Sequence, residues 1–114
     1  MILASFSVVL VPFPFADRLV EKLRPAVIVS RPELLAEAGV VWLAMITSSS
    51  RSRSGDVEVS DPEAAGVHTA CRVRTAKLAT VDPRRILEEI GVLPTEDSRQ
   101  VMRFLAAHLA RASD

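Results

Sequence analysis

The 114-residue chain has few of the residues that build covalent or metal-bound frameworks. Its only cysteine, Cys71, cannot form an internal disulfide, and a reducing compartment such as the cytoplasm is expected. The two histidines are far apart in sequence and have no zinc-type spacing with the cysteine. We therefore expect no metal site and no cofactor. We interpret His68 as a loop residue and expect His108 to pack against the core or a partner.

The chain also has no net charge, no long apolar run and only four glycines. Lys and Arg (14) balance Asp and Glu (14), so no overall basic field indicates a nucleic-acid-binding surface. No apolar stretch approaches the roughly 20 residues of a membrane span, and the N-terminus lacks the features of a signal peptide. The four glycines form no phosphate-binding loop and no nucleophile elbow. We expect one soluble domain over residues 1–114, with no membrane partner.

Apolar, β-branched runs dominate the first half of the chain. The runs Ser7–Phe13, Ala26–Ser30 and Val40–Ile46 are too continuous for strands with one solvated face. Such runs predict strands that are buried on both faces or closed into a small barrel. Trp42 lies inside the third run, and we expect it in the core.

Shorter patterns complete the strand prediction. Residues 31–39 predict a turn with a short helical piece that Gly39 closes. Val57–Val59 and Arg72–Leu78 alternate between polar and apolar residues, as half-exposed strands do.

The C-terminal third predicts two helices. Asp82 and Pro83 are typical of a helix start, and Gly91 would follow its end. A second helix is expected from about Glu96 to Ala112, with Asp97 and Gln100 spaced as a capping box. Strands first and helices last indicate a mainly β fold with C-terminal helices.

Cations and hydroxyls gather at the predicted strand ends. Arg24, Thr47, Ser48 and Arg74 could together hold an anion without a metal, because guanidinium and hydroxyl groups donate to phosphate oxygens. The low-complexity run Ser48–Ser54 fits either a solvated hairpin loop or a mobile arm whose arginines contact phosphates.

These motifs follow one another as VVLVPFPFAD, KLRPAVIVS, MITSSS, GDVEVSDPEAAGV and RVRTAKLATVD. In this order the chain resembles the MazF/PemK (Kid-like) toxins of bacterial type II toxin–antitoxin modules, from Ser7 to about Leu109. The resemblance implies an SH3-like β-barrel of the CcdB/MazF/PemK type, a homodimer and a cognate antitoxin as partner. It also implies a metal-independent endoribonuclease for single-stranded RNA, usually mRNA. In that reaction the ribose 2′-hydroxyl attacks the adjacent phosphate, leaving a 2′,3′-cyclic phosphate and a 5′-hydroxyl.

The resemblance also assigns residues. It implies a catalytic role for Arg24, Thr47 and Arg74. Further candidates for contacts with RNA lie close to these residues in the sequence: Lys22, Ser48, Arg51 and Arg53.

Two departures from the family pattern stand out. Phe6-Ser7 replaces the usual Gly-Asp before the first strand, and Ala76 replaces an aspartate that PemK-type members carry two residues after the arginine matched by Arg74.

The proton acceptor is left open between Asp17 and Glu21, because an arginine is a poor base. Arg24 would hold transition-state charge; the alternative is a structural salt bridge to one of these two carboxylates. The alternative function is a toxin-fold binding protein without nuclease activity, or a CcdB-like inhibitor of DNA gyrase.

Overall fold

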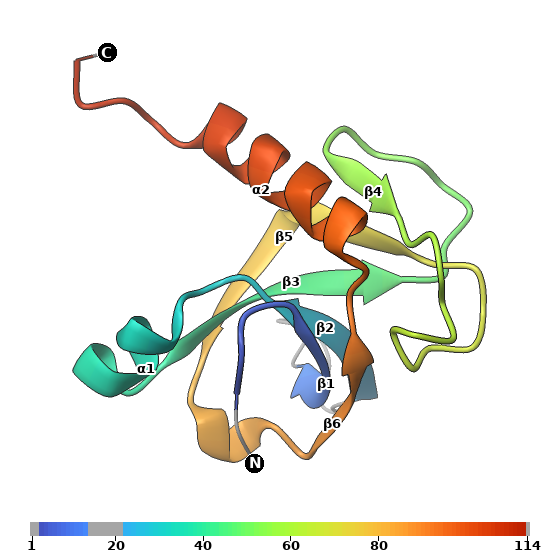
Figure 1. The fold of residues 1–114 in the computed structure, drawn as a ribbon, viewed down its shortest axis with the longest axis horizontal. Helices are drawn as coiled ribbons and strands as arrows, with labels where there is room; N and C mark the ends of the chain where they lie inside the picture. Colours follow the sequence, from blue (N-terminus) through green and yellow to red (C-terminus); the bar gives the residue numbers. More distant parts are fainter. Residues whose placement is uncertain (1–2, 14–21, 114) are drawn as a thin grey trace.

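A six-stranded antiparallel sheet forms most of the computed structural model, which describes residues 3–13 and 22–113 (Figure 1). The strands are β1 (Ser7–Phe13), β2 (Lys22–Ile28), β3 (Val41–Thr47), β4 (Asp56–Glu58), β5 (Arg72–Val81) and β6 (Glu88–Val92), in the order β4-β5-β3-β2-β1-β6. The other elements are α1 (Pro32–Ala38), a 3₁₀ turn η1 (Pro83–Arg85) and α2 (Thr95–His108). The expected mainly β fold is confirmed, with one C-terminal helix. No helix in the described ranges is long and apolar enough to cross a membrane.

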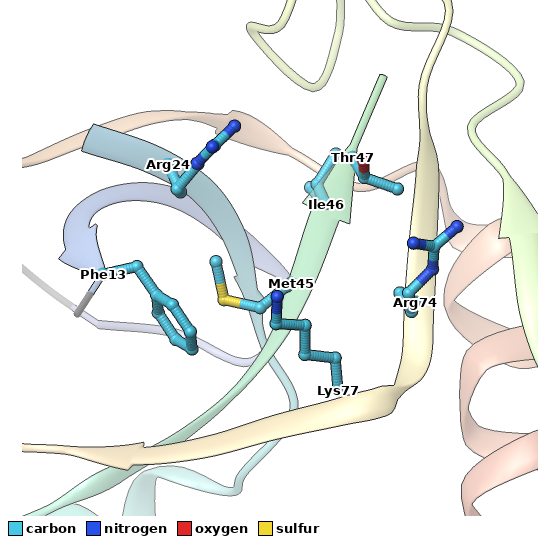
Figure 2. Close-up of a pocket in the computed structure, with 7 residues that line it drawn as sticks. All are labelled: Phe13, Arg24, Met45, Ile46, Thr47, Arg74 and Lys77. Atoms are coloured by element: carbon cyan, nitrogen blue, oxygen red, sulfur yellow. The ribbon is translucent and has the colours of Figure 1, made fainter. Parts of the chain in front are cut away.

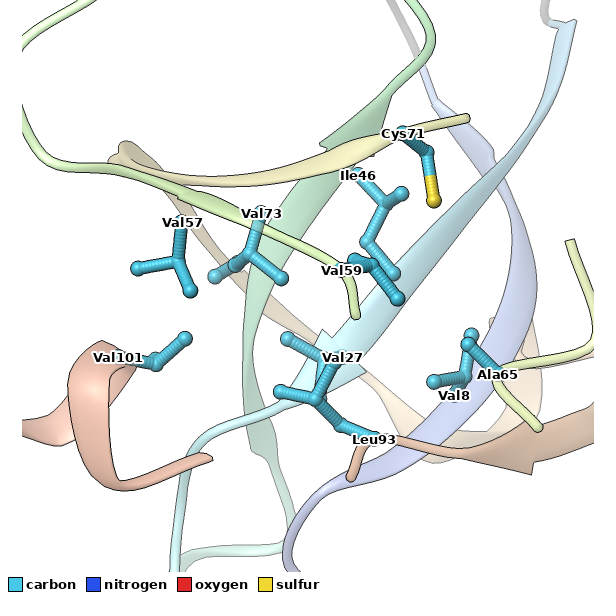
Figure 3. Packing of buried hydrophobic residues seen from close by; sticks show 11 residues of the cluster. Val8, Val27, Ile46, Val57, Val59, Ala65, Cys71, Val73, Leu93 and Val101 are labelled. Atoms are coloured by element: carbon cyan, nitrogen blue, oxygen red, sulfur yellow. The ribbon is translucent and has the colours of Figure 1, made fainter. Parts of the chain in front are cut away.

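The central strands of the sheet bury side chains on both faces, as their continuous apolar runs predict. On β1, Val8 belongs to one apolar cluster, while Val9 and Val11 belong to another on the opposite face. The first cluster lies under α2, whose Val101 points toward Val27 of β2 (Figure 3). Because successive side chains point to opposite faces, a strand covered on both sides needs apolar residues at every position.

The predicted helix from Asp82 to Gly91 is wrong. Asp82 does cap a turn, because its carboxylate accepts the Arg84 backbone N–H at 2.8 Å, but the turn ends at Arg85. The hydrogen bonds from the Arg84 side chain and backbone lower the pKa of Asp82 to about 2. The chain then continues as β6, which pairs with β1. Pairing along an otherwise open sheet edge overrides the local preference for helix.

The predicted capping box on the last helix is also wrong. Helix α2 begins at Thr95 after Pro94, and no side chain caps it. The Asp97 carboxylate is instead buried and accepts hydrogen bonds from the Ser60 backbone N–H (2.9 Å) and hydroxyl (3.0 Å). Asp97 therefore ties the loop after β4 to α2.

Trp42, which we expected in the core, and His108, which we expected against the core or a partner, both lie at the surface of the chain. Trp42 is 50% exposed, because its side of β3 faces a groove beside α2 rather than the interior. His108 is exposed at the end of α2, where its Nδ1 lies 2.8 Å from the Phe104 carbonyl oxygen, so it does not pack against the core. His68 lies in a loop, as expected, and pairs there with Glu63.

Phe6 occupies the position where the resembling family has glycine. Its φ of 68° lies in the left-handed region, which costs a residue with a Cβ roughly 1–2 kcal/mol. Two backbone hydrogen bonds hold it there: Phe6 N–H donates to the Ile28 carbonyl (2.7 Å), and Leu93 N–H donates to the Phe6 carbonyl (2.9 Å). The Phe6 side chain also packs against the first apolar cluster, which offsets part of the strain.

A bulge bends β5 in the middle. Arg74 is paired with Met45 of β3, and Leu78 is paired with the adjacent Ala44, so residues 75–77 have no opposite partner on β3. Bulges increase local bending and change the direction of side chains. This one brings Lys77 toward the sheet face that carries Met45 and Arg74.

Candidate functional site

A small polar pocket lies where β1, β2, β3 and β5 come together (Figure 2). It has a volume of about 160 Å³ and is lined by Phe13, Arg24, Met45, Ile46, Thr47, Arg74 and Lys77. The buried Met45 side chain forms part of the pocket lining, and the charged side chains lie around Met45 (Figure 2). The three residues for which the resemblance implies catalysis are therefore brought together, although they are up to 50 positions apart in sequence (74 − 24).

Arg24 and Thr47 reach the pocket through strand register. Arg24 lies on β2 opposite Val11 of β1, near the end of β2 that is away from the buried core. Thr47 is the last residue of β3, two positions after Met45 and therefore on the same face. Its Oγ1 accepts the Ser49 backbone N–H at 3.1 Å, which turns the chain away from the sheet and leaves the threonine at the pocket.

Arg74 is held by a carboxylate from the neighbouring strand. Asp56 of β4 lies directly opposite Arg74, and its carboxylate accepts Nε and Nη2 of the guanidinium, both at 3.2 Å. Nη2 also donates to the Arg51 carbonyl at 2.8 Å. Asp56 of β4 thus gives Arg74 a carboxylate partner, a pairing that no spacing along β5 could indicate.

Lys77 is the pocket residue that sequence reasoning missed. Its Nζ lies 5.4 Å from the centre of the Phe13 ring, a cation–π distance. In a regular strand, residues 74 and 77 would point to opposite faces, so only the bulge at 75–77 allows both cations to line one pocket. The alternating pattern of this strand carries no sign of a three-residue bulge.

The further RNA-contact candidates lie around the pocket without lining it. Lys22 is exposed at the start of β2, opposite Phe13. Ser48, Arg51 and Arg53 are exposed in the loop between β3 and β4. That loop is tied at its backbone, because Arg53 N–H donates to the Asp56 carboxylate at 2.9 Å. Asp17 and Glu21, the proposed proton acceptors, lie outside the described residues.

The described residues offer little support for two other kinds of site, a cysteine nucleophile and a metal centre. Cys71 is buried, and burial together with the nearby Glu58 and Asp97 carboxylates raises the pKa of its thiol. A raised pKa disfavours the nucleophilic thiolate. Among residues 3–13 and 22–113, no group of three or more His, Cys, Asp or Glu side chains could hold a metal ion.

Comparison with solved structures shows the same fold in known toxins. MazF of Deinococcus radiodurans superposes with a TM-score of 0.74 at 19% identity, over 91% of this chain and 93% of that chain. The toxin MazF-mt6 of Mycobacterium tuberculosis gives 0.71 at 18% identity, over 89% and 93%. An endoribonuclease in complex with its cognate antitoxin, from a mycobacterial species, gives 0.71 at 17% identity, over 91% of each chain. No match was found among curated protein sequences.

The sequence itself matches a family model over residues 4–109, nearly its whole length. That match covers all six strands, the pocket and α2. The chain belongs to the PemK-like, MazF-like toxins of type II toxin–antitoxin systems.

Proposed function

We propose that the chain is an endoribonuclease that cleaves single-stranded RNA, chiefly mRNA, without a metal ion. The main support is the pocket, in which Arg24, Arg74 and Lys77 surround one small space beside the Thr47 hydroxyl. The pocket volume of about 160 Å³ leaves room for a phosphate group. Cations with directed donors around such a space favour a phosphate ligand.

In the proposed reaction, the 2′-oxygen forms a bond to phosphorus while the bond to the 5′-oxygen breaks. Negative charge develops on the phosphate oxygens, where Arg24, Arg74 and Lys77 stabilise it by preorganised electrostatics. Thr47 orients the phosphate or the 2′-hydroxyl. The proton of the 2′-hydroxyl passes to Asp17 or Glu21, because an arginine side chain is already protonated and is a poor base. The 5′-oxygen takes a proton from solvent water and leaves as a hydroxyl.

The test is cleavage of a long, diverse RNA pool by the purified protein in EDTA. We expect cuts at a recurring short sequence, with 2′,3′-cyclic phosphate and 5′-hydroxyl ends identified by end-specific sequencing. A 2′-deoxy substitution at the cut site should abolish cleavage there, because it removes the nucleophile. Absence of cleavage in every RNA would reject the nuclease and favour the binding-protein or gyrase-inhibitor alternative.

We also propose a cognate antitoxin as the partner that inhibits the enzyme, acting in the cytoplasm, where mRNA is found. A cationic pocket beside the Phe13 ring suits an antitoxin segment that carries acidic and apolar side chains. Such a segment would compete with RNA for the same site.

An uncharged face suits the homodimer that the resemblance implies. A groove of about 350 Å³ runs between α2 and the outer side of β3 and β5, and we call its lining the helix–sheet patch: Val29, Trp42, Leu78, Ala79, Thr80, Met102, Leu105 and Leu109. Leu109 is 70% exposed there. A two-fold interface brings each patch against its own copy, so a patch without charge avoids repulsion between like charges. We propose a second copy of the chain as its occupant.

Placing a charge on the helix–sheet patch should dissociate the dimer. In sedimentation at micromolar protein, we expect the wild type at twice the 12.4 kDa of one chain and Leu78→Asp near 12.4 kDa. Leu87→Asp is the matched control, because Leu87 is an equally exposed leucine outside the patch. A wild-type monomer, or a Leu78→Asp dimer, would contradict this arrangement.

A further inference from the structure

Arg74 is held in the pocket by a largely buried ion pair. Its side chain is 14% exposed and that of Asp56 only 6%, and the two meet through two hydrogen bonds across adjacent strands. Nε and Nη2 are both occupied, whereas Nη1 has no hydrogen-bond partner among the residues that the structure describes. The guanidinium is thus fixed in orientation with one nitrogen left to meet a ligand.

The same carboxylate also closes the loop between β3 and β4. Asp56 accepts the Arg53 backbone N–H, while Arg74 donates to the Arg51 carbonyl. The backbone of residues 51–53 is therefore tied at both ends to the Asp56–Arg74 ion pair. A buried hydrogen bond from the Thr75 hydroxyl to the Gly55 carbonyl, at 2.7 Å, joins the loop to the bulge of β5. The loop that carries Arg51 and Arg53 is therefore positioned together with Arg74.

Asp56 is unsuited to accept a proton itself. Burial alone would raise the pKa of its carboxyl, but hydrogen bonds from the Arg74 side chain and the Arg53 backbone, with the charges of Arg74 and Arg72, hold that pKa below its ordinary value. Both carboxylate oxygens are engaged by these donors. The lowered pKa favours the charged carboxylate, whose role is to hold its hydrogen-bond donors in place.

We infer that Asp56 is a positioning residue of the proposed nuclease: it orients Arg74 toward the scissile phosphate and fixes the loop of Arg51 and Arg53 beside it. This inference rests on the proposed function. A carboxylate that holds two nitrogens of a guanidinium restricts it to one plane. Misplacing such a group by about 1 Å can cost roughly 100-fold in rate.

The experiment compares Asp56→Asn, Arg74→Ala and the double variant, using single-turnover cleavage of one RNA, KM and thermal unfolding. We expect Asp56→Asn to lower the cleavage rate about 10- to 100-fold while KM changes by less. In the Arg74→Ala background the same substitution should cause little further loss, because its target is already gone. A merely stabilising ion pair would instead lower the melting temperature and leave the rate of the folded enzyme unchanged.

Glu58→Gln is the matched control. Glu58 also lies on β4 opposite an arginine, Arg72, and forms an ion pair with it at 2.9 Å, but its side chain is 69% exposed. We expect the Glu58→Gln variant to cleave RNA at a rate near that of the wild type. An unchanged rate for Asp56→Asn, or additive losses in the double variant, would overturn the role of Asp56 while wild-type cleavage still supports the nuclease. A wild type that cleaves no RNA would reject the nuclease itself, and the positioning role of Asp56 with it.

Discussion

Replacing Arg24 with alanine should reduce RNA cleavage at least about 100-fold, the cost of losing one preorganised donor to a developing oxyanion. Arg24 reaches the pocket from the end of β2, where it faces Thr47 and Arg74 rather than the apolar core. Its removal therefore takes charge from the phosphate site without opening a core cavity. We expect the melting temperature to change little, and the cleavage rate and melting temperature should be measured on one preparation.

Three further variants make this result specific. Thr47→Ala and Lys77→Ala should each lower the rate by a smaller factor, since a neutral donor and a flexible ammonium contribute less than a fixed guanidinium. Arg31→Ala is the control, because Arg31 is a highly exposed arginine outside the pocket. If Arg24 served only as a structural salt bridge, Arg24→Ala would lower the melting temperature while the folded protein cleaved normally. Unchanged cleavage would remove Arg24 from the active site.

The strands could be predicted because their apolar runs are local and strong. Ser7–Phe13 forms β1 with the predicted bounds, and Val40–Ile46 differs from β3 by one residue at each end. The second strand begins four residues earlier than predicted, at Lys22, because pairing with β1 extends it past its apolar part. Periodicity reports burial, whereas the ends of a strand depend on its neighbours.

The helix predicted after β5 was wrong because the local sequence favours a helix start, whereas the tertiary structure favours a strand beside β1. The Asp-Pro start is real, but it ends in a single 3₁₀ turn at Arg85. The next residues pair with the open edge of β1, so the backbone hydrogen bonds of β6 replace those that a helix would have formed. Local capping residues identify where a turn begins and not how far it continues.

The candidate site was partly visible in the sequence. Arg24, Thr47 and Arg74 each lie at or near a strand end, and the resemblance indicated that they belong together. Asp56 and Lys77 were not identified, because their contribution depends on cross-strand register and on the β5 bulge. Both features are three-dimensional, and neither leaves a distinct spacing in one sequence.

Replacing Gly91 with alanine should destabilise the fold by about 3 kcal/mol or more, at the upper end of overpacking effects. Gly91 of β6 lies opposite Val8, and a Cβ there would come within 2.4 Å of the Ala65 carbonyl carbon and 2.5 Å of the Ala64 oxygen. These are backbone atoms that cannot rotate away. Ala64 also accepts the Val92 N–H at 3.0 Å, so relieving the clash would break a hydrogen bond that fastens the loop to β6.

Gly39→Ala separates this steric effect from backbone strain. Gly39 has a φ of 73°, and a Cβ added to it would meet no atom within 4 Å, so alanine there should cost only the left-handed penalty of roughly 1–2 kcal/mol. Urea unfolding of both variants, with equal slopes, measures the two costs. Because neither glycine lines the pocket, the folded fraction of Gly91→Ala should cleave RNA at the wild-type rate. Equal destabilisation by the two variants would show that β6 and the loop can separate without cost, and that the close backbone packing at Gly91 does not stabilise this sheet edge.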